Sequence, residues 1–165
     1  MKFNSVKEYF YKLNNTGYQL MMVPLILFTG YYSQSYFFDT KLKIELPSVS
    51  AYLPFAFLGI AVIVLTTVQL VFRSNVRKVA SKIGLGIKLE KLGTQLKSRM
   101  IWQALIALIM PLGLVLTDDP LFIIFFVLAL TWYFIHWPSP TLVSRLLRLR
   151  GDEKEMVLSR GEAFK

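Results

Sequence analysis

The chain has 165 residues, 55% of them hydrophobic and 15% aromatic, with a net charge of +9 and no cysteine. The lack of cysteine excludes disulfides, thiolate metal sites and thiol catalysis. The apolar content exceeds what a soluble domain of this size can bury. We attribute the positive charge to cytoplasmic loops of a membrane protein, which are enriched in Lys and Arg, and expect no nucleic-acid partner.

Four apolar runs dominate the sequence, at residues 18–38, 52–72, 100–116 and 121–137. None of them contains Asp, Glu, Lys or Arg. A helix needs about 17–25 residues to cross the hydrocarbon core of a membrane, and each run is close to that length. The sequence therefore predicts an all-α, polytopic membrane protein, with four transmembrane helices in a single domain that covers 1–165.

Basic residues divide unequally between the segments that separate these runs. Of the 19 lysines and arginines, 17 lie before the first run, between the second and third, or after the fourth. Only Lys41 and Lys43 lie elsewhere. The positive-inside rule then predicts that both termini are cytoplasmic and that the links at 39–51 and 117–120 are external. The expected location is a bacterial inner membrane.

Two basic stretches are predicted to form short amphipathic helices on the cytoplasmic membrane surface. Residues 1–17 end in a predicted turn or helix cap at 14–17. Residues 73–99 carry an apolar stripe that glycines are expected to break around 84–86. The expected partner is anionic lipid, which attracts each basic side chain by roughly 1 kcal/mol near the surface. The predicted lipid contacts are Arg73, Arg77, Lys78, Lys82, Lys88, Arg145 and Arg148.

The link between the third and fourth runs contains two aspartates followed by Pro120. Paired carboxylates can bind a metal or perform acid–base chemistry. A helix start explains them more simply, because Asp118 or Asp119 can cap the fourth span while proline occupies its first turn. So short a link requires the third and fourth spans to form an antiparallel hairpin.

The cytoplasmic tail covers 141–165. Ser139 or Thr141 is expected to cap a last amphipathic helix that continues to Arg150, and Gly151 is expected to end it. The residues that follow have mixed charge and are too few for a domain.

Polar side chains in or beside the spans are the candidates for transport or catalysis. These are Gln34, Thr66, Thr67, Gln69, Gln103 and His136. Coupled transporters usually carry an acid or base inside the membrane, and these spans have none. His136 is the only histidine, so it lacks the further ligands that a metal site needs, and its neighbours Trp132 and Trp137 indicate an interfacial aromatic belt.

These features favour a non-enzymatic membrane subunit, or assembly partner, of a larger membrane protein complex. Its partners would be membrane lipids and other membrane subunits or further copies of the chain. No catalytic, cofactor-binding or metal-binding residue is predicted, and no phosphate-binding or dinucleotide motif is present. One alternative is a small oligomeric channel or carrier lined by the polar residues of the spans. Another is a lipid-acting enzyme that uses His136 with Asp152 or Glu153.

Overall fold

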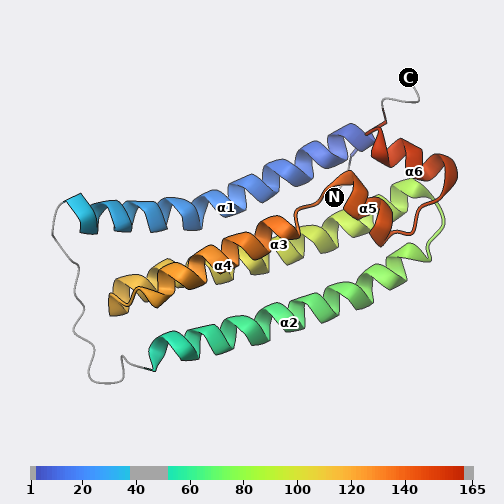
Figure 1. The fold of residues 1–165 in the computed structure, drawn as a ribbon. Helices are drawn as coiled ribbons and strands as arrows, with labels where there is room; N and C mark the ends of the chain where they lie inside the picture. The colour runs from blue at the N-terminus through green and yellow to red at the C-terminus, as the bar shows by residue number, and fades with distance from the viewer. Residues whose placement is uncertain (1–2, 38–51, 162–165) are drawn as a thin grey trace. The chain divides into compact units, whose positions relative to one another are not determined.

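The structure is a computed structural model that describes residues 3–37 and 52–161 (Figure 1). The helices are α1 (Val6–Phe37), α2 (Leu53–Ala80), α3 (Leu85–Thr117), α4 (Leu121–Ile135), α5 (Pro140–Leu146) and α6 (Gly151–Leu158). The described residues contain no strand, so the prediction of an all-helical chain is confirmed. The expected external loop at 39–51 lies outside the described residues.

The chain divides into two compact units. We call residues 1–18, 68–100 and 137–165 the basic unit, and residues 19–67 and 101–136 the apolar unit. The basic unit holds 17 of the 19 lysines and arginines. In the described part of the apolar unit, the only charged side chains are Asp118 and Asp119. The division of the fold therefore coincides with the division of charge along the sequence.

Three of the helices continue well beyond the apolar runs. Helix α1 is unbroken from Val6 to Phe37, so the turn expected at 14–17 is absent. Residues 73–80 are the last part of α2, and residues 85–99 are the first part of α3. The prediction that the basic segments form helices separate from the spans was wrong at both places, whereas the predicted break near Gly84 is present. Its basis was a change in composition, and backbone hydrogen bonding in a helix continues across such a change.

Glycine explains both the missing turn and the true break. A Cβ on Gly17 would lie 2.9 Å from the Trp137 ring, so this glycine permits close packing inside the basic unit. Gly84 has a φ of +91°, which glycine adopts without steric cost, and it closes the link between α2 and α3. The helix break therefore falls just before Leu85, and Gly86 lies within the first turn of α3.

Aromatic side chains bring all four long helices together in the apolar unit. The ring of Phe28 on α1 stacks on Phe126 of α4 with a centroid distance of 4.2 Å. Phe57 on α2 meets Phe122 of α4 edge to face at 5.7 Å. Phe122 also packs against Gly113 of α3, where a Cβ would come within 2.2 Å of the ring. Phe122 and Phe126 are fully buried, and they form the centre of this unit.

The link between α3 and α4 is as short as expected. The Asp119 carboxylate accepts a hydrogen bond from the backbone N–H of Leu121 at 2.9 Å, at the start of α4. The Thr117 hydroxyl donates to the carbonyl of Gly113 at 2.9 Å and accepts from the N–H of Asp119 at 3.3 Å. The N-cap position itself is Pro120, and the predicted carboxylate contact at this helix start is made by Asp119, one residue earlier.

The basic unit has an apolar core of its own. The side chains that fill it are Tyr9, Phe10, Leu13, Phe72, Val76, Val79, Leu89, Leu92, Leu96, Met100, Val143, Leu147, Leu149 and Val157. They come from α1, α2, α3, the α5 region and α6. Most of the apolar stripe of residues 73–99 is thus buried against protein, which corrects the expectation that these side chains face lipid, whereas Ile83 and Ile87 are exposed.

The tail folds into two helices instead of one. Ser139 caps α5 as predicted, because its hydroxyl accepts from the backbone N–H of Leu142 at 3.2 Å. Helix α5 ends at Leu146, and Arg148 adopts a φ of +52°. Gly151 begins α6, where we expected it to end a helix. The burial of Val157 in the core of the basic unit explains why a segment of mixed charge becomes helical.

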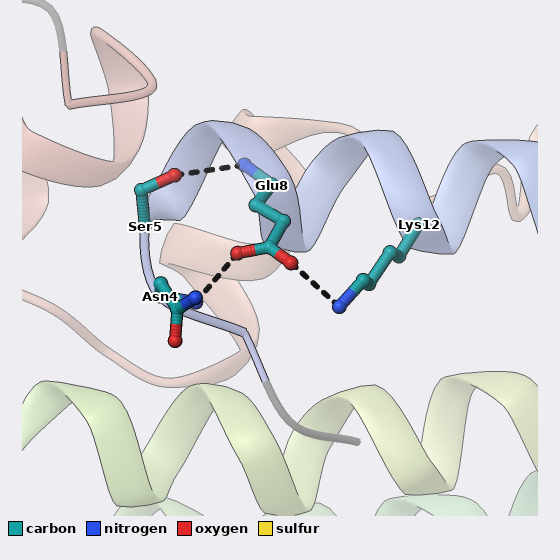
Figure 2. A network of polar contacts seen from close by, with 4 residues as sticks. All are labelled: Asn4, Ser5, Glu8 and Lys12. Carbon is teal, nitrogen blue, oxygen red and sulfur yellow. Dashed lines mark hydrogen bonds and ion pairs between the residues drawn. The ribbon is translucent and has the colours of Figure 1, made fainter.

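A capping network fixes the start of α1 (Figure 2). The Ser5 hydroxyl accepts from the N–H of Glu8 at 3.1 Å, and the Glu8 carboxylate accepts from the N–H of Asn4 at 2.7 Å. The same carboxylate pairs with the Lys12 amine at 2.6 Å. The hydrogen bond from Lys12 and then that from Asn4 lower the pKa of Glu8. The Ser-x-x-Glu spacing that predicts such a capping box was present in the sequence and overlooked.

Among the described residues, α2 and α3 are long and apolar enough to cross a membrane. Helix α4 and helix α5 meet at a bend of 72° and together would count as a third candidate. Helix α1 is outside this group because tyrosine, serine and glutamine make its second half less apolar. Two or three helices therefore have the length and composition of membrane spans.

The contact between Gly113 and Phe122 predicts a sharp response to one methyl group. Gly113→Ala should lower the stability of the detergent-solubilised protein by about 1–3 kcal/mol, because the buried ring has little room to move. Gly59→Ala is the matched control on α2, where a Cβ would meet nothing within 4 Å. Thermal unfolding of both variants measures the difference. Equal stability would contradict the packing described here.

The capping network predicts a pH dependence. Because folding lowers the pKa of Glu8, its contribution to stability is complete above the ordinary pKa of about 4.3 and is lost as the pH falls through the lowered value. Glu8→Gln should remove this part of the acid sensitivity, whereas Glu155→Gln, at an exposed position of α6, should retain it. Thermal unfolding at pH 7 down to pH 3 is the measurement. Identical pH profiles for the wild type and Glu8→Gln would refute the assignment.

Candidate functional site

The predicted lipid contacts lie in the basic unit, and most of them are exposed. Arg73, Arg77 and Lys78 project from the last turns of α2, and Lys82 lies in the link that follows. Arg145 is exposed on α5, and Arg148 is exposed just after it. These side chains are accessible, but most of the apolar stripe that was expected to hold them on the membrane is buried, and only Ile83 and Ile87 of it are strongly exposed.

Two of the predicted contacts interact with other charged side chains. The Lys88 amine pairs with the Glu153 carboxylate at 2.9 Å and is half-buried, which ties α3 to α6 inside the basic unit. A side-chain hydrogen bond with Lys91 lowers the pKa of Lys82, and the like charge of Lys91 acts in the same direction. Lys88 is thus a structural ion-pair partner, and its contact with anionic lipid stays a prediction.

The most buried cation of the described residues was not singled out from the sequence. Arg99 is 3% exposed, and its guanidinium lies over the Phe72 ring at 4.3 Å from the centroid. One helical turn away, the Asn75 amide donates to the Gln95 amide oxygen at 3.0 Å. Both contacts join α2 to α3 within the basic unit. The signal was available, since Arg99 continues the helical spacing of Leu92 and Leu96.

A second polar group is buried in the same core. The Tyr9 side chain is fully buried between apolar neighbours, and its ring contacts Phe3 at 5.1 Å and Phe10 at 5.2 Å. Its hydroxyl has no hydrogen-bond partner among the described residues, and burial raises the pKa of this phenol. A buried polar atom without a partner costs stability, so apolar packing of the ring outweighs the loss at this position.

The polar residues predicted for the membrane interior differ in their exposure. Gln34, Thr66 and Thr67 are exposed, Gln69 is half-buried and Gln103 is buried. The Thr67 hydroxyl donates to the carbonyl of Ile63 in its own helix at 2.8 Å, as expected for threonine in an apolar helix.

A cavity of about 370 Å³ in the apolar unit lies between α2 and α3. It is lined by Phe57, Ile60, Ala61, Val64, Trp102, Leu105 and neighbouring apolar residues of α3. None of the six polar candidates lines it. Its surface suits hydrocarbon better than an ion or a polar solute.

His136 ends α4 and has local partners. Its Nδ1 lies 2.9 Å from the carbonyl oxygen of Trp132, and its ring packs against the Trp132 ring at 4.5 Å between centroids. In the basic unit, Trp137 lies against Tyr18 at 4.7 Å. Of the acids considered as partners of His136, Glu153 pairs with Lys88, and Asp152 is exposed in the first turn of α6.

Comparison with protein-family models, with curated proteins and with solved structures finds no match for this chain. Within residues 3–37 and 52–161, no group of three His, Asp or Glu side chains is placed to hold a metal ion. Charge, packing and exposed apolar surface are therefore the observations on which a function can be based.

Proposed function

We propose that this chain is an integral subunit, or assembly partner, of a larger complex in a bacterial inner membrane. Helices α1 to α4 cross the membrane, and the basic unit lies in the cytoplasm with both termini. The observation that carries this proposal is the agreement between fold and charge. The basic unit contains 17 of the 19 lysines and arginines. The described helices of the apolar unit contain none, although the same helices run through both units.

The membrane topology is supported by the cost of charge in hydrocarbon. A lysine or arginine at the centre of a membrane helix costs at least about 2.5–3.5 kcal/mol, so the basic unit has to remain outside. The last 13 residues of α2 and the first 16 of α3 belong to the basic unit, whereas their remaining parts carry no charge. These two helices therefore extend beyond the hydrocarbon on the basic side.

Helices α1 and α4 are assigned to the membrane because they pack in the apolar unit with α2 and α3, the two candidate spans. Helix α4 has 15 residues, which corresponds to about 22 Å and is shorter than the hydrocarbon core. Its aromatic contacts with Phe28 of α1 and Phe57 of α2 place it among helices of the apolar unit. Polar ends of a short span are tolerated when the bilayer thins locally, which makes four spans consistent with these lengths.

A structural role is supported by the exposed surface of α2. Only 11% of the residues in its apolar 18-residue stretch are buried, compared with 50% for α3. Exposed Ile60 and Ile63 lie beside Ala56 and Gly59, and small residues permit close approach of a neighbouring helix. In a membrane, this surface faces lipid or another subunit, and its small residues favour contact with a helix of another subunit.

The alternatives have less support. A carrier needs polar groups that converge, yet the polar candidates differ in exposure and the cavity of the apolar unit is lined by apolar side chains. An interfacial enzyme would use His136 with an acid of α6, where Glu153 is already paired with Lys88. Neither alternative is favoured by a specific observation.

The proposed topology can be tested by cysteine labelling, because the chain has no cysteine and the wild type is its own blank. Pro120→Cys, at the external link, should react with a membrane-impermeant maleimide in intact cells. Ser81→Cys, in the link between α2 and α3, should react only after the membrane is permeabilised. Both positions are exposed, so access to the reagent decides the result. The reverse pattern would overturn the orientation.

The subunit role can be tested by photo-crosslinking in the native host. A photoreactive amino acid at Ile63, which is 67% exposed on α2, should give a discrete protein adduct in membranes. The same amino acid at Phe122, which is fully buried, is the control and should give no adduct with another chain. Mass spectrometry of the adduct identifies the partner or a second copy. Lipid adducts alone at Ile63 and at its neighbour Ile60 would refute the proposal.

A further inference from the structure

The basic unit contains an open hollow, lined by polar and basic residues, that is separate from the surfaces considered above. It has a volume of about 440 Å³ and is lined by Tyr11, Lys12, Asn15 and Thr16 of α1 and by Thr94 and Lys97 of α3. Two lysines, an asparagine and a tyrosine are therefore among the residues that line one hollow. No acidic side chain lines it, and the nearest described carboxylate contact is the ion pair of Glu8 with Lys12.

The groups of this cavity differ in what they can offer a ligand. The hydroxyls of Thr16 and Thr94 donate to carbonyls of their own helices, those of Lys12 and Glu90. These two hydroxyls form part of the wall and do not donate hydrogen bonds to a ligand. The amine of Lys97, the amine of Lys12 and the amide of Asn15 are donors, and two of these carry positive charge. Such a set suits an anionic oxygen ligand, because charge-assisted hydrogen bonds to phosphate are strong.

The position of the cavity along both helices indicates where that anion comes from. Thr16 precedes the apolar run of α1 by two residues, and Lys97 precedes that of α3 by three, which are rises of about 3 Å and 4.5 Å. Both helices are continuous across these points. In the proposed topology, the cavity thus opens at the level of the cytoplasmic headgroups. Exposed Tyr11 and Tyr18 fit that depth, since tyrosine is enriched at membrane interfaces.

We propose that this cavity binds the phosphate headgroup of one anionic phospholipid of the cytoplasmic leaflet, with Lys12 and Lys97 as its charged contacts. The inference rests on the proposed membrane topology and adds a defined lipid site to it. Basic pockets between membrane helices on the cytoplasmic side are suited to such headgroups. The volume lies within the range of small-ligand pockets. Lys12 and Lys97 are exposed, like the arginines and lysines of α2 and α5, but they line one hollow between two helices.

The test uses the full chain in nanodiscs of phosphatidylcholine with a minor fraction of phosphatidylglycerol. Native mass spectrometry should detect one retained phosphatidylglycerol on the wild type. Lys12→Gln combined with Lys97→Gln should reduce this retention about tenfold or more. Arg77→Gln combined with Lys78→Gln removes the same charge at exposed positions outside the cavity and should retain the lipid. Equal loss in both double variants, or no loss in either, would overturn the site.

Three further measurements separate loss of the site from loss of folding, from binding of another anion and from a wrong topology. Lys97→Gln alone leaves the ion pair of Lys12 with Glu8 intact and should still lower retention several-fold in a protein with wild-type helicity. Thermal stabilisation by phosphatidylglycerol but not by millimolar inorganic phosphate assigns the anion to a lipid. Equal stabilisation by inorganic phosphate would overturn the lipid assignment. Cysteine labelling of the same nanodisc sample separates the two proposals, because correct labelling without lipid retention refutes only this site.

Discussion

The cost of placing charge in hydrocarbon is the constraint on which the rest of this structure depends. It separates the chain into a unit with 17 basic residues and a unit whose described helices carry no charge, with two aspartates in the link between α3 and α4. The separation runs through the long helices and not between them, because α1, α2 and α3 each contribute to both units. Helical hydrogen bonding is local, so a helix can change its surroundings without changing its backbone.

The two units are stabilised by different contacts. In the apolar unit, phenylalanine rings of α1, α2 and α4 meet, and Gly113 allows α3 to approach the Phe122 ring. The basic unit contains an ordinary apolar core with polar insertions, including Arg99 over Phe72 and the Lys88–Glu153 ion pair. Water is available to this unit in the proposed topology, so hydrophobic burial can stabilise it in the usual way.

This arrangement changes the meaning of the basic segments. Considered alone, residues 73–99 have the pattern of a helix that lies on a membrane, with apolar and cationic faces. Val76, Val79 and Leu92 instead fill a protein core, and most of the cations are left on its surface, whereas Arg99 is buried in it. An amphipathic pattern indicates that one face is covered, and it does not indicate whether lipid or protein covers it. The polar cavity of α1 and α3 arises only because the two helices pack side by side in this core.

The sequence by itself determined the helical class, the apolar segments, the helix ends at the 117–120 link, the contact of Asp119 with the start of α4 and the cap at Ser139. These features depend on local composition and on side chains within a few residues of one another. Tertiary structure decided that α1 continues through Gly17, that the tail forms α6, that Arg99 is buried and that Lys12 and Lys97 line one cavity. The physical reason is that each of these outcomes depends on a neighbour far away in the chain. Trp137 packs against Gly17, Val157 enters a core built by other helices, and the walls of the cavity come from residues about 80 positions apart.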